Sequence, residues 1–242
     1  MNLTRKMMPI LAAIGMAAAA PVAMADEITL APSNIGQSYS FNFDGFSGGT
    51  SIDGLTSSAT FTLTGVTSNS YTFSYSLTNT STDPIDSRVS SFAFNTDPNI
   101  ASATSTGAFS YTTVGSSYPN GIGSVDVCFK DAATGSCAGG GSGGLTDGQT
   151  GTGSLTLNFS QPLTSLTLSD FYVRYQSISG AGNVTSASGA GTLTSSTSTS
   201  STTGGTSVPE PGMLGLLGGA AAALVIMRRR RTIRKSPVLA AA

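Results

Sequence analysis

Apolar and polar residues alternate along the middle of the chain with a period of two. The clearest example is the segment 71–78, in which every second residue is Tyr, Phe or Leu and the residues between them are Ser or Thr. A strand places successive side chains on opposite faces, so this pattern predicts a strand with one buried face. Shorter segments with the same alternation are 39–43, 61–63, 155–159 and 171–175.

Residue pairs that are typical of turns separate these segments. They are Asp44-Gly45, Asp53-Gly54, Asp83-Pro84, Asp97-Pro98, Asn120-Gly121 and Asp147-Gly148. Gly and Asn tolerate the backbone angles that turns need, and Pro fixes one of those angles. Many short strands between turns favour an all-β fold, an antiparallel β-sandwich or jelly roll over residues 26–193. The pattern does not choose between these two topologies.

The first 25 residues have the pattern of a secretory signal peptide. Arg5 and Lys6 precede an apolar stretch, and Ala23-Met24-Ala25 supplies the small residues of a cleavage site. We therefore expect residues 1–25 to direct export and to be removed before Asp26. An uncleaved N-terminal anchor is the alternative interpretation.

The C-terminal region predicts a linker, a short transmembrane helix and a tail. Residues 194–207 are almost wholly Ser, Thr and Gly, which favours a flexible spacer. Residues 212–227 are apolar or small, and a helix of this length spans about 24 Å, less than the ~30 Å hydrocarbon core. Basic residues favour the cytoplasmic side, so the run of Arg228, Arg229, Arg230 and Arg231 would stop this marginal anchor at the inner membrane. Residues 236–242 form the tail.

A proline-containing motif precedes this anchor. Val208, Pro209, Glu210 and Pro211 are followed by the apolar run and then by the arginines, and this order resembles the PEP-CTERM sorting domain over residues 208–235. The resemblance implies recognition by an exosortase, a membrane-embedded processing enzyme, and delivery to the bacterial cell surface or the extracellular matrix of a biofilm. Two prolines also keep the motif extended, in a form that a processing enzyme can bind.

Charge is distributed unevenly along the chain. Residues 26–208 carry three bases, Arg88, Lys130 and Arg174, against eleven acids, a formal net charge of −8. Nucleic-acid binding relies on Lys and Arg to neutralise phosphates, so we expect no nucleic-acid partner. The chain has no histidine, which excludes Ser-His-Asp catalysis. No catalytic residue is predicted, and we expect the protein not to be an enzyme.

The two cysteines, Cys128 and Cys137, lie nine positions apart in a region that we expect to be exported. A disulfide bond is the default in an oxidising compartment. A catalytic or metal-binding thiol pair is the alternative, but zinc sites need further Cys or His ligands that the chain lacks.

Acidic residues in or near the predicted turns raise the question of calcium. Extracellular β-domains can hold calcium with turn carboxylates, and the acids concerned here are Asp44, Asp53, Asp83, Asp86 and Asp97. None has the spacing of a twelve-residue calcium loop, so turn-capping is the stronger interpretation and no metal ligand is predicted. Nothing in the sequence selects two of them as a glycosidase pair.

The segment 170–178 carries the densest set of chemically informative residues. Tyr172, Arg174 and Gln176 would lie on the strand face opposite Phe171, Val173 and Tyr175. Such a strip could bind a sugar by stacking and hydrogen bonding, whereas a structural ion pair of Arg174 is the more ordinary role. The stretch from Cys128 to this strand is similar to a subgroup of PEP-CTERM proteins called the cistern type.

These features lead to one expected function and one alternative. The first is a non-enzymatic cell-surface or extracellular-matrix protein that an exosortase sorts and processes. The alternative is a carbohydrate-binding module, calcium-assisted in one version, that contacts exopolysaccharide. The absence of tryptophan counts against the alternative, because indole is the best stacking surface.

Overall fold

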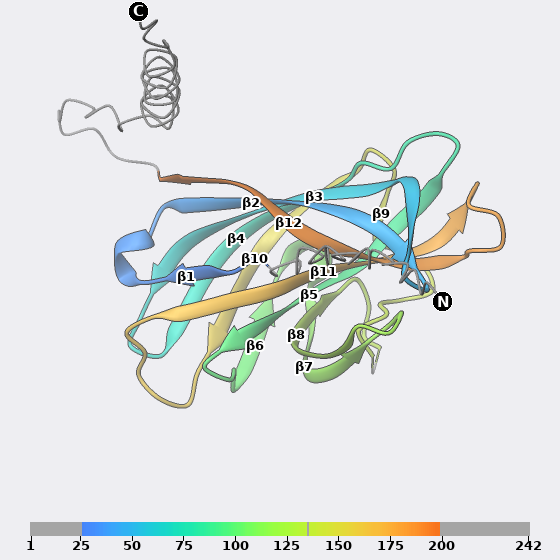
Figure 1. Ribbon diagram of the computed structural model, residues 1–242. Coiled ribbons are helices and arrows are strands. Elements are labelled where there is room, and N and C mark those ends of the chain that lie inside the picture. The colour runs from blue at the N-terminus through green and yellow to red at the C-terminus, as the bar shows by residue number, and fades with distance from the viewer. Residues whose placement is uncertain (1–25, 135, 199–242) are drawn as a thin grey trace, which may run out of the picture. The chain divides into compact units, whose positions relative to one another are not determined.

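The computed structural model describes residues 26–134 and 136–198, and these form an almost entirely β structure (Figure 1). Two short 3-10 turns, η1 (Pro32–Asn34) and η2 (Gly107–Phe109), interrupt the strands. The strands are β1 (Ile28–Leu30), β2 (Gln37–Ser47), β3 (Thr50–Val66), β4 (Ser70–Asn79), β5 (Asp86–Asp97), β6 (Ser102–Ser105), β7 (Tyr111–Tyr118), β8 (Gly123–Lys130), β9 (Leu145–Thr146), β10 (Thr150–Asn158), β11 (Leu166–Ser179) and β12 (Ser186–Ser198).

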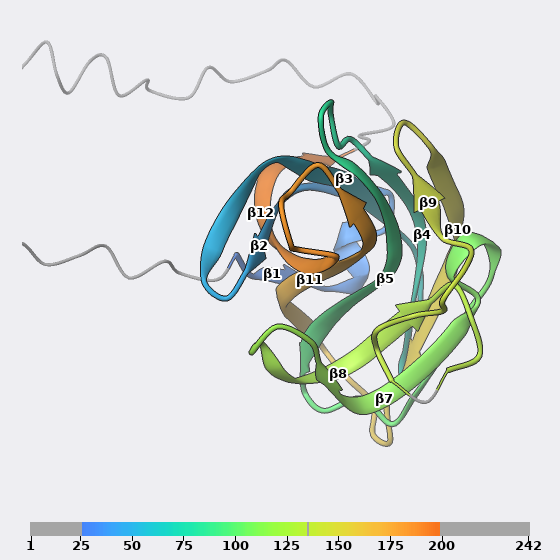
Figure 2. The same cartoon turned by 90° about the vertical axis from the view of Figure 1, so that its right-hand side faces the viewer.

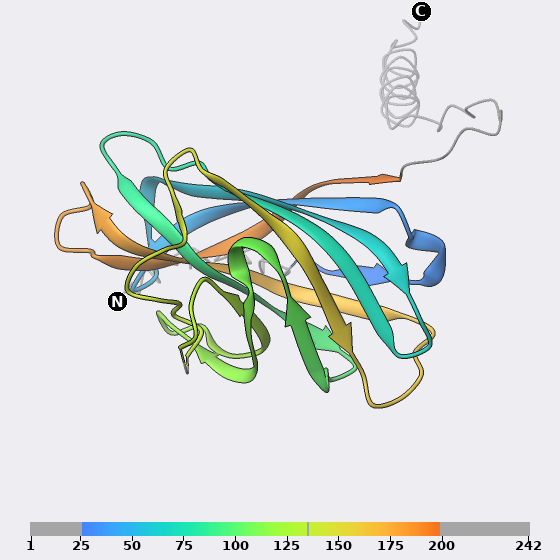
Figure 3. The same cartoon turned by 180° about the vertical axis from the view of Figure 1, so that it is seen from behind.

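All twelve strands belong to one sheet. Ten of them follow the order β6-β10-β4-β3-β2-β12-β11-β5-β8-β7, while β1 pairs with β11 and β9 pairs with β5. Every pairing is antiparallel. The sheet is rolled, as the view in Figure 2 shows, and Figures 1 and 3 show its long strands from opposite sides.

The two ends of the sheet order meet side by side. The Thr112 hydroxyl of β7 donates a hydrogen bond to the Ala103 carbonyl of β6 at 3.0 Å. This contact brings the sheet close to closing on itself. The closure is incomplete, because no ladder pairing joins β6 and β7 among the described residues. The all-β prediction is confirmed. The more specific prediction of a β-sandwich or jelly roll is wrong. The strands form one rolled sheet joined by continuous pairing, and not two separate packed sheets.

The interior of the roll contains the main apolar core. Aromatic rings dominate it: Phe41 stacks on Phe171 with ring centroids 4.1 Å apart, and Phe92 stacks on Phe129 at 4.8 Å. The alternation in the sequence accounts for this arrangement, because every second residue of β4 is buried. Burial of these rings and aliphatic side chains is the main source of folding free energy.

The outer face of the roll is lined with hydroxyl groups. Ser38 and Thr62 bond across β2 and β3 at 2.7 Å, and Thr78 and Thr150 bond across β4 and β10 at 2.8 Å. Such cross-strand hydroxyl pairs each add a small stabilisation to a sheet. Period-two alternation thus separates an aromatic interior from a Ser/Thr exterior.

Two predicted turns fall inside strands. Asp44-Gly45 lies in β2 at a register shift against β3, and Asp53-Gly54 lies within β3. Gly45 is needed for packing, because a Cβ atom there would lie 2.5 Å from the Leu55 side chain. At such a bulge the chain bends without reversing, which a dipeptide signal cannot distinguish from a turn.

Strand β12 extends past the predicted start of the linker. Residues 195–198 pair with β2, so the structured part continues five residues beyond position 193. Backbone ladder bonds need no apolar side chain, and threonine is favourable in strands. The predicted signal peptide (1–25), the rest of the linker and the sorting signal, anchor and tail (208–242) lie outside the described residues. Within the described ranges, the helical segments are too short to span a bilayer.

Candidate functional site

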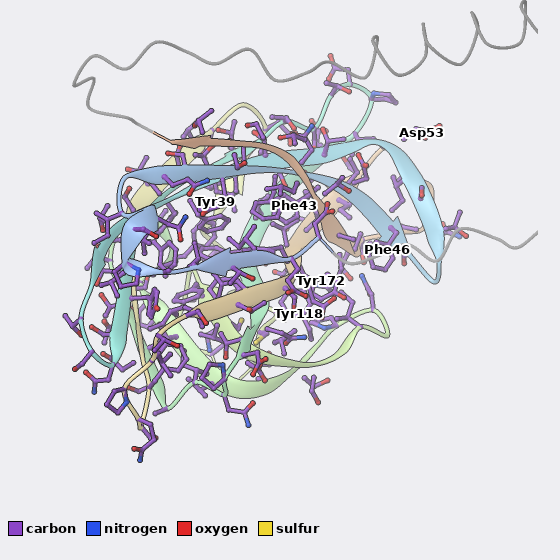
Figure 4. The ribbon with its side chains drawn as sticks, turned by 60° about the vertical axis from the view of Figure 1, so that its left-hand side comes forward. Tyr39, Phe43, Phe46, Asp53, Tyr118 and Tyr172 are labelled. Atoms are coloured by element: carbon purple, nitrogen blue, oxygen red, sulfur yellow. The ribbon has the colours of Figure 1, made fainter. Side chains whose placement is uncertain are left out.

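A second, smaller apolar cluster lies on the outer face of the sheet. It consists of Ala93, Tyr118, Val125, Cys128 and Cys137, with Ile122 and Tyr172 packed against it. Strands β5, β7 and β8 supply the first four, and Cys137 comes from the loop after β8. Tyr118 and Tyr172 lie together, with ring centroids 5.9 Å apart (Figure 4). This cluster is where most of the sequence-predicted site residues of the β domain meet.

Cys128 and Cys137 are both buried within the cluster, and both are free thiols. The two thiols lie in hydrogen-bonding contact, which lowers the pKa of Cys137, and burial raises the pKa of Cys128 well above its ordinary value. The sequence was therefore right to associate the two residues. The predicted disulfide is not formed in the structure, and it stays a prediction.

Arg88 fastens the loop 131–144 to the sheet. Its Nη1 atom bonds Asp131 at 3.1 Å and the Gly143 carbonyl at 2.9 Å, and its Nη2 atom bonds the Gly140 carbonyl and Gln176. The Asp131 carboxylate also accepts a bond from the Gly140 N–H at 2.6 Å. The Arg88 and Asp131 side chains are only 8% and 2% exposed, so this is a buried ion pair. No pattern in the sequence predicts this ion pair.

Lys130 is also buried in this region. Its ammonium group donates to the Thr113 hydroxyl at 2.6 Å and to the Thr134 carbonyl. Together with Arg88 and Arg174 it completes the set of bases in residues 26–198, and all three are buried. The exposed charges of the described residues are therefore all negative.

The strip of Tyr172, Arg174 and Gln176 does lie on the face opposite Phe171, Val173 and Tyr175, but it is covered. The Arg174 Nη1 atom donates to the Ala187 carbonyl at 3.0 Å, and the Gln176 amide donates to the Ala138 carbonyl at 2.5 Å. Burial lowers the pKa of Arg174. The expected open ligand strip is thus corrected to a packed surface beneath the cysteine cluster and its loop.

The more ordinary expectation, an ion pair of Arg174, is also wrong for the described residues. Their single salt bridge joins Arg88 to Asp131. Arg174 uses a backbone carbonyl instead, and its Nε atom is buried without a hydrogen-bond partner. Position on a strand face could be predicted from the sequence, but the partner could not.

The acids considered for calcium do not form a cluster. No group of three or more His, Cys, Asp or Glu side chains that could hold a metal ion occurs within residues 26–134 and 136–198. Asp44, Asp53, Asp83, Asp86 and Asp97 are each exposed.

A hollow of about 310 Å³ opens on the outer face over β2 and β3. Its lining includes Asn42, Asp44, Thr56, Ser58 and Thr80. From the sequence, Asp44 was considered as a turn residue and as a candidate calcium ligand, and the other lining residues were not predicted. The available signal was the alternation of β2, which places Asn42 and Asp44 on the same face.

Comparison with protein families matches residues 207–231 to the PEP-CTERM protein-sorting motif. The match includes the predicted motif at 208–211 and the arginines at 228–231. It does not reach residues 128–178, so the cistern-type subgroup stays a proposal. Searches of curated proteins and of solved structures returned no match. The chain is thus a protein that carries the PEP-CTERM sorting motif, the signal through which an exosortase directs proteins toward the cell surface.

Proposed function

We propose that the protein is an exported, non-enzymatic component of the bacterial cell surface or extracellular matrix. The observation that carries this proposal is the PEP-CTERM match at residues 207–231. Residues 1–25 would direct export, and residues 212–227 would hold the chain transiently in the inner membrane until the exosortase acts at the motif. The rolled sheet would then be released or transferred to the surface.

The contacts of the three bases, the packing of the cysteines and the lack of histidine support a non-enzymatic role. The three bases of the domain hold the loop 131–144 and the sheet together, which leaves none of them to bind a substrate. The cysteines are packed among apolar side chains. The chain also has no histidine to act as a general base near neutral pH.

The sorting step can be tested by following the chain in a host that has an exosortase. Three forms are compared by cell fractionation: the full chain, a chain truncated after Ser207, and the Glu210→Ala variant. Pro237→Ala, in the tail beyond the motif, is the matched control. We expect the full chain and the control to reach the cell surface and the other two to be missing from it. An unchanged destination for the truncated chain would refute the sorting proposal.

The alternative function, carbohydrate binding, is still supported, but its candidate site is a different part of the surface. Tyr172, Arg174 and Gln176 are committed to internal contacts, so they no longer support it. The hollow over β2 and β3 presents polar groups that have no such partners, and it is the observation that favours this second function.

A further inference from the structure

The hollow over β2 and β3 has a regular polar lining. Asn42 stands opposite Ser58, and Asp44 stands opposite Thr56 in the ladder that joins the two strands. Residues two apart on a strand are about 7 Å apart, and neighbouring strands are about 4.8 Å apart. The four side chains therefore mark the corners of a small rectangle on the outer face. Thr80 follows β4 and extends the lining beyond Thr56.

Three of these four side chains have unused hydrogen-bonding capacity. Asn42, Asp44 and Ser58 make no side-chain hydrogen bond within the described residues. Some other positions on the same face differ, because their hydroxyls bond in pairs, as Ser40 and Thr60 do at 3.0 Å. Thr56 is also paired, with the Thr80 hydroxyl at 2.9 Å. The hollow thus brings three free polar side chains together on two neighbouring strands.

The chemistry of the free groups favours a ligand rich in hydroxyls. The Asp44 carboxylate only accepts hydrogen bonds, while the Asn42 amide and the Ser58 hydroxyl both donate and accept. A sugar hydroxyl also donates and accepts, so adjacent hydroxyls of one ring can satisfy this mixed set. A hydrogen bond to a carboxylate is among the stronger ones, which makes Asp44 the expected anchor.

Charge narrows the class of sugar. The exposed charges of the described residues are all negative, because all three bases are buried. A polysaccharide with uronate or phosphate groups would bring like charges beside Asp44 and would be repelled. A neutral polysaccharide meets no such penalty. The volume of about 310 Å³ lies at the lower end of the range of small-molecule sites, which suits one or two sugar rings.

We propose that the hollow lined by Asn42, Asp44 and Ser58 binds a neutral polysaccharide through its sugar hydroxyls. The proposal rests on the proposed function in one respect, since a surface protein needs such a ligand within reach. Each site contributes a modest affinity because no aromatic ring of the hollow is exposed for stacking. Many copies on one surface would raise the overall strength through multivalency.

The test uses the full chain purified in a mild detergent and titrated by calorimetry. The probes are neutral hexasaccharides of glucose, mannose and galactose, a hexauronate of equal length and a hexasaccharide of glucosamine. We expect saturable binding of at least one neutral hexasaccharide and none of the hexauronate. Asp44→Ala should weaken the binding about tenfold or more, and Asn42→Ala and Ser58→Ala should weaken it by smaller factors.

Two exposed positions supply matched controls. Asp53→Ala removes the same charge from the neighbouring part of β3, and Figure 4 shows Asp53 apart from Phe43, the neighbour of Asp44. Ser74→Ala removes a hydroxyl from the same outer face outside the hollow. Both controls should bind as the unaltered chain does. Thermal melting of every variant checks that each is folded.

Three results would overturn the proposal: no neutral hexasaccharide binds, Asp53→Ala weakens binding as much as Asp44→Ala, or only the glucosamine probe binds. The last result would mean simple charge attraction. Because this titration uses purified protein, it is independent of sorting. A failure of binding therefore leaves the fractionation result intact, and a failure of sorting leaves the binding result intact.

Discussion

All five N–H groups of the Arg88 guanidinium donate hydrogen bonds. The acceptors are Ser177 at 3.3 Å, Asp131, Gln176 and the carbonyls of Gly140 and Gly143. A guanidinium has five N–H donors, so the side chain is saturated. It sits between β5, β11 and the loop 131–144, and it converts a glycine-rich loop into an ordered cover for the cysteine cluster.

Removal of this arginine should therefore be costly. Arg88→Met is expected to lower the free energy of unfolding by about 3–5 kcal/mol, because it leaves the Asp131 carboxylate buried without its partner. Urea unfolding followed by fluorescence measures the change. The double variant Arg88→Met/Asp131→Asn should recover part of the loss. If the double variant lost as much as the sum of the two single changes, the pair would not be coupled.

For single residues, the sequence predicted the strand face of a side chain better than its hydrogen-bond partners. It placed Arg174 opposite Val173 and brought Cys128 and Cys137 together, since these inferences depend only on strand geometry and short chain distance. It did not predict the burial of Arg88 or Lys130. Most of their partners lie far away in the chain, such as Gln176 for Arg88 and Thr113 for Lys130, and no local pattern reports such contacts.

Among the elements, the loop 131–144 depends most on glycine. Gly144 has a φ angle of +75°, and a Cβ atom there would lie 2.3 Å from the Val89 carbonyl oxygen. Gly141 has open space around it and no positive φ. The loop is therefore tightly packed at Gly144 and loosely packed at Gly141.

These two glycines make a matched pair. Gly144→Ala should destabilise the fold by about 2–4 kcal/mol through backbone strain and overpacking, while Gly141→Ala should change stability by less than about 0.5 kcal/mol. Thermal and urea unfolding of both variants provide the comparison. Equal effects of the two substitutions would show that the loop is not packed against β5 as described.

The same loop would be held covalently if the cysteines are oxidised. We expect the protein recovered from the exported fraction to contain a Cys128–Cys137 disulfide, two hydrogens lighter in intact mass than the reduced form. Oxidation by a disulfide-exchange enzyme would raise stability by about 2–3 kcal/mol in urea unfolding. The Cys128→Ala/Cys137→Ala variant should not respond to reductant. Free thiols in the exported protein would contradict the prediction.

The strands themselves were only partly predictable. Segments with clean alternation, such as 71–78, became strands with one buried face. Strand β5 lacks alternation because nearly all of its residues are buried, the outer ones under the cysteine cluster and its loop. Strand β12 has few apolar residues at its end, and backbone pairing with β2 defines it instead.

For the whole domain, the sequence predicted the all-β fold class but not that the strands form one rolled, nearly closed sheet. Alternation says that one face of each strand is buried, and this holds equally for two packed sheets and for one rolled sheet. The difference lies in which strands pair. Pairs such as β2 with β12 and β4 with β10 join segments far apart in the chain, and neither hydrophobic pattern nor turn residues encode such distant pairing.

The many buried tyrosines make the domain sensitive to alkali. Burial raises the pKa of Tyr118 and Tyr175 above the ordinary value, and it raises those of Tyr39, Tyr71, Tyr75 and Tyr172 as well. Above pH ~10 the unfolded chain loses phenol protons that the folded chain keeps, so the stability that is present below pH 10 declines.

The expected slope is about 1.4 kcal/mol per pH unit for each fully buried tyrosine. Urea unfolding of the oxidised protein between pH 8 and pH 11 measures it, since oxidation removes the contribution of the thiols. Tyr118→Phe should reduce the slope. A free energy of unfolding that stays constant up to pH 11 would contradict the burial of these rings.

Delivery of the rolled sheet to the cell surface by the C-terminal motif can be tested by the intact mass of the protein recovered from the surface. We expect a chain that begins at Asp26 and ends near residues 208–211, with the arginine run removed. A surface protein whose mass corresponds to a chain still carrying residues 212–242 would contradict it.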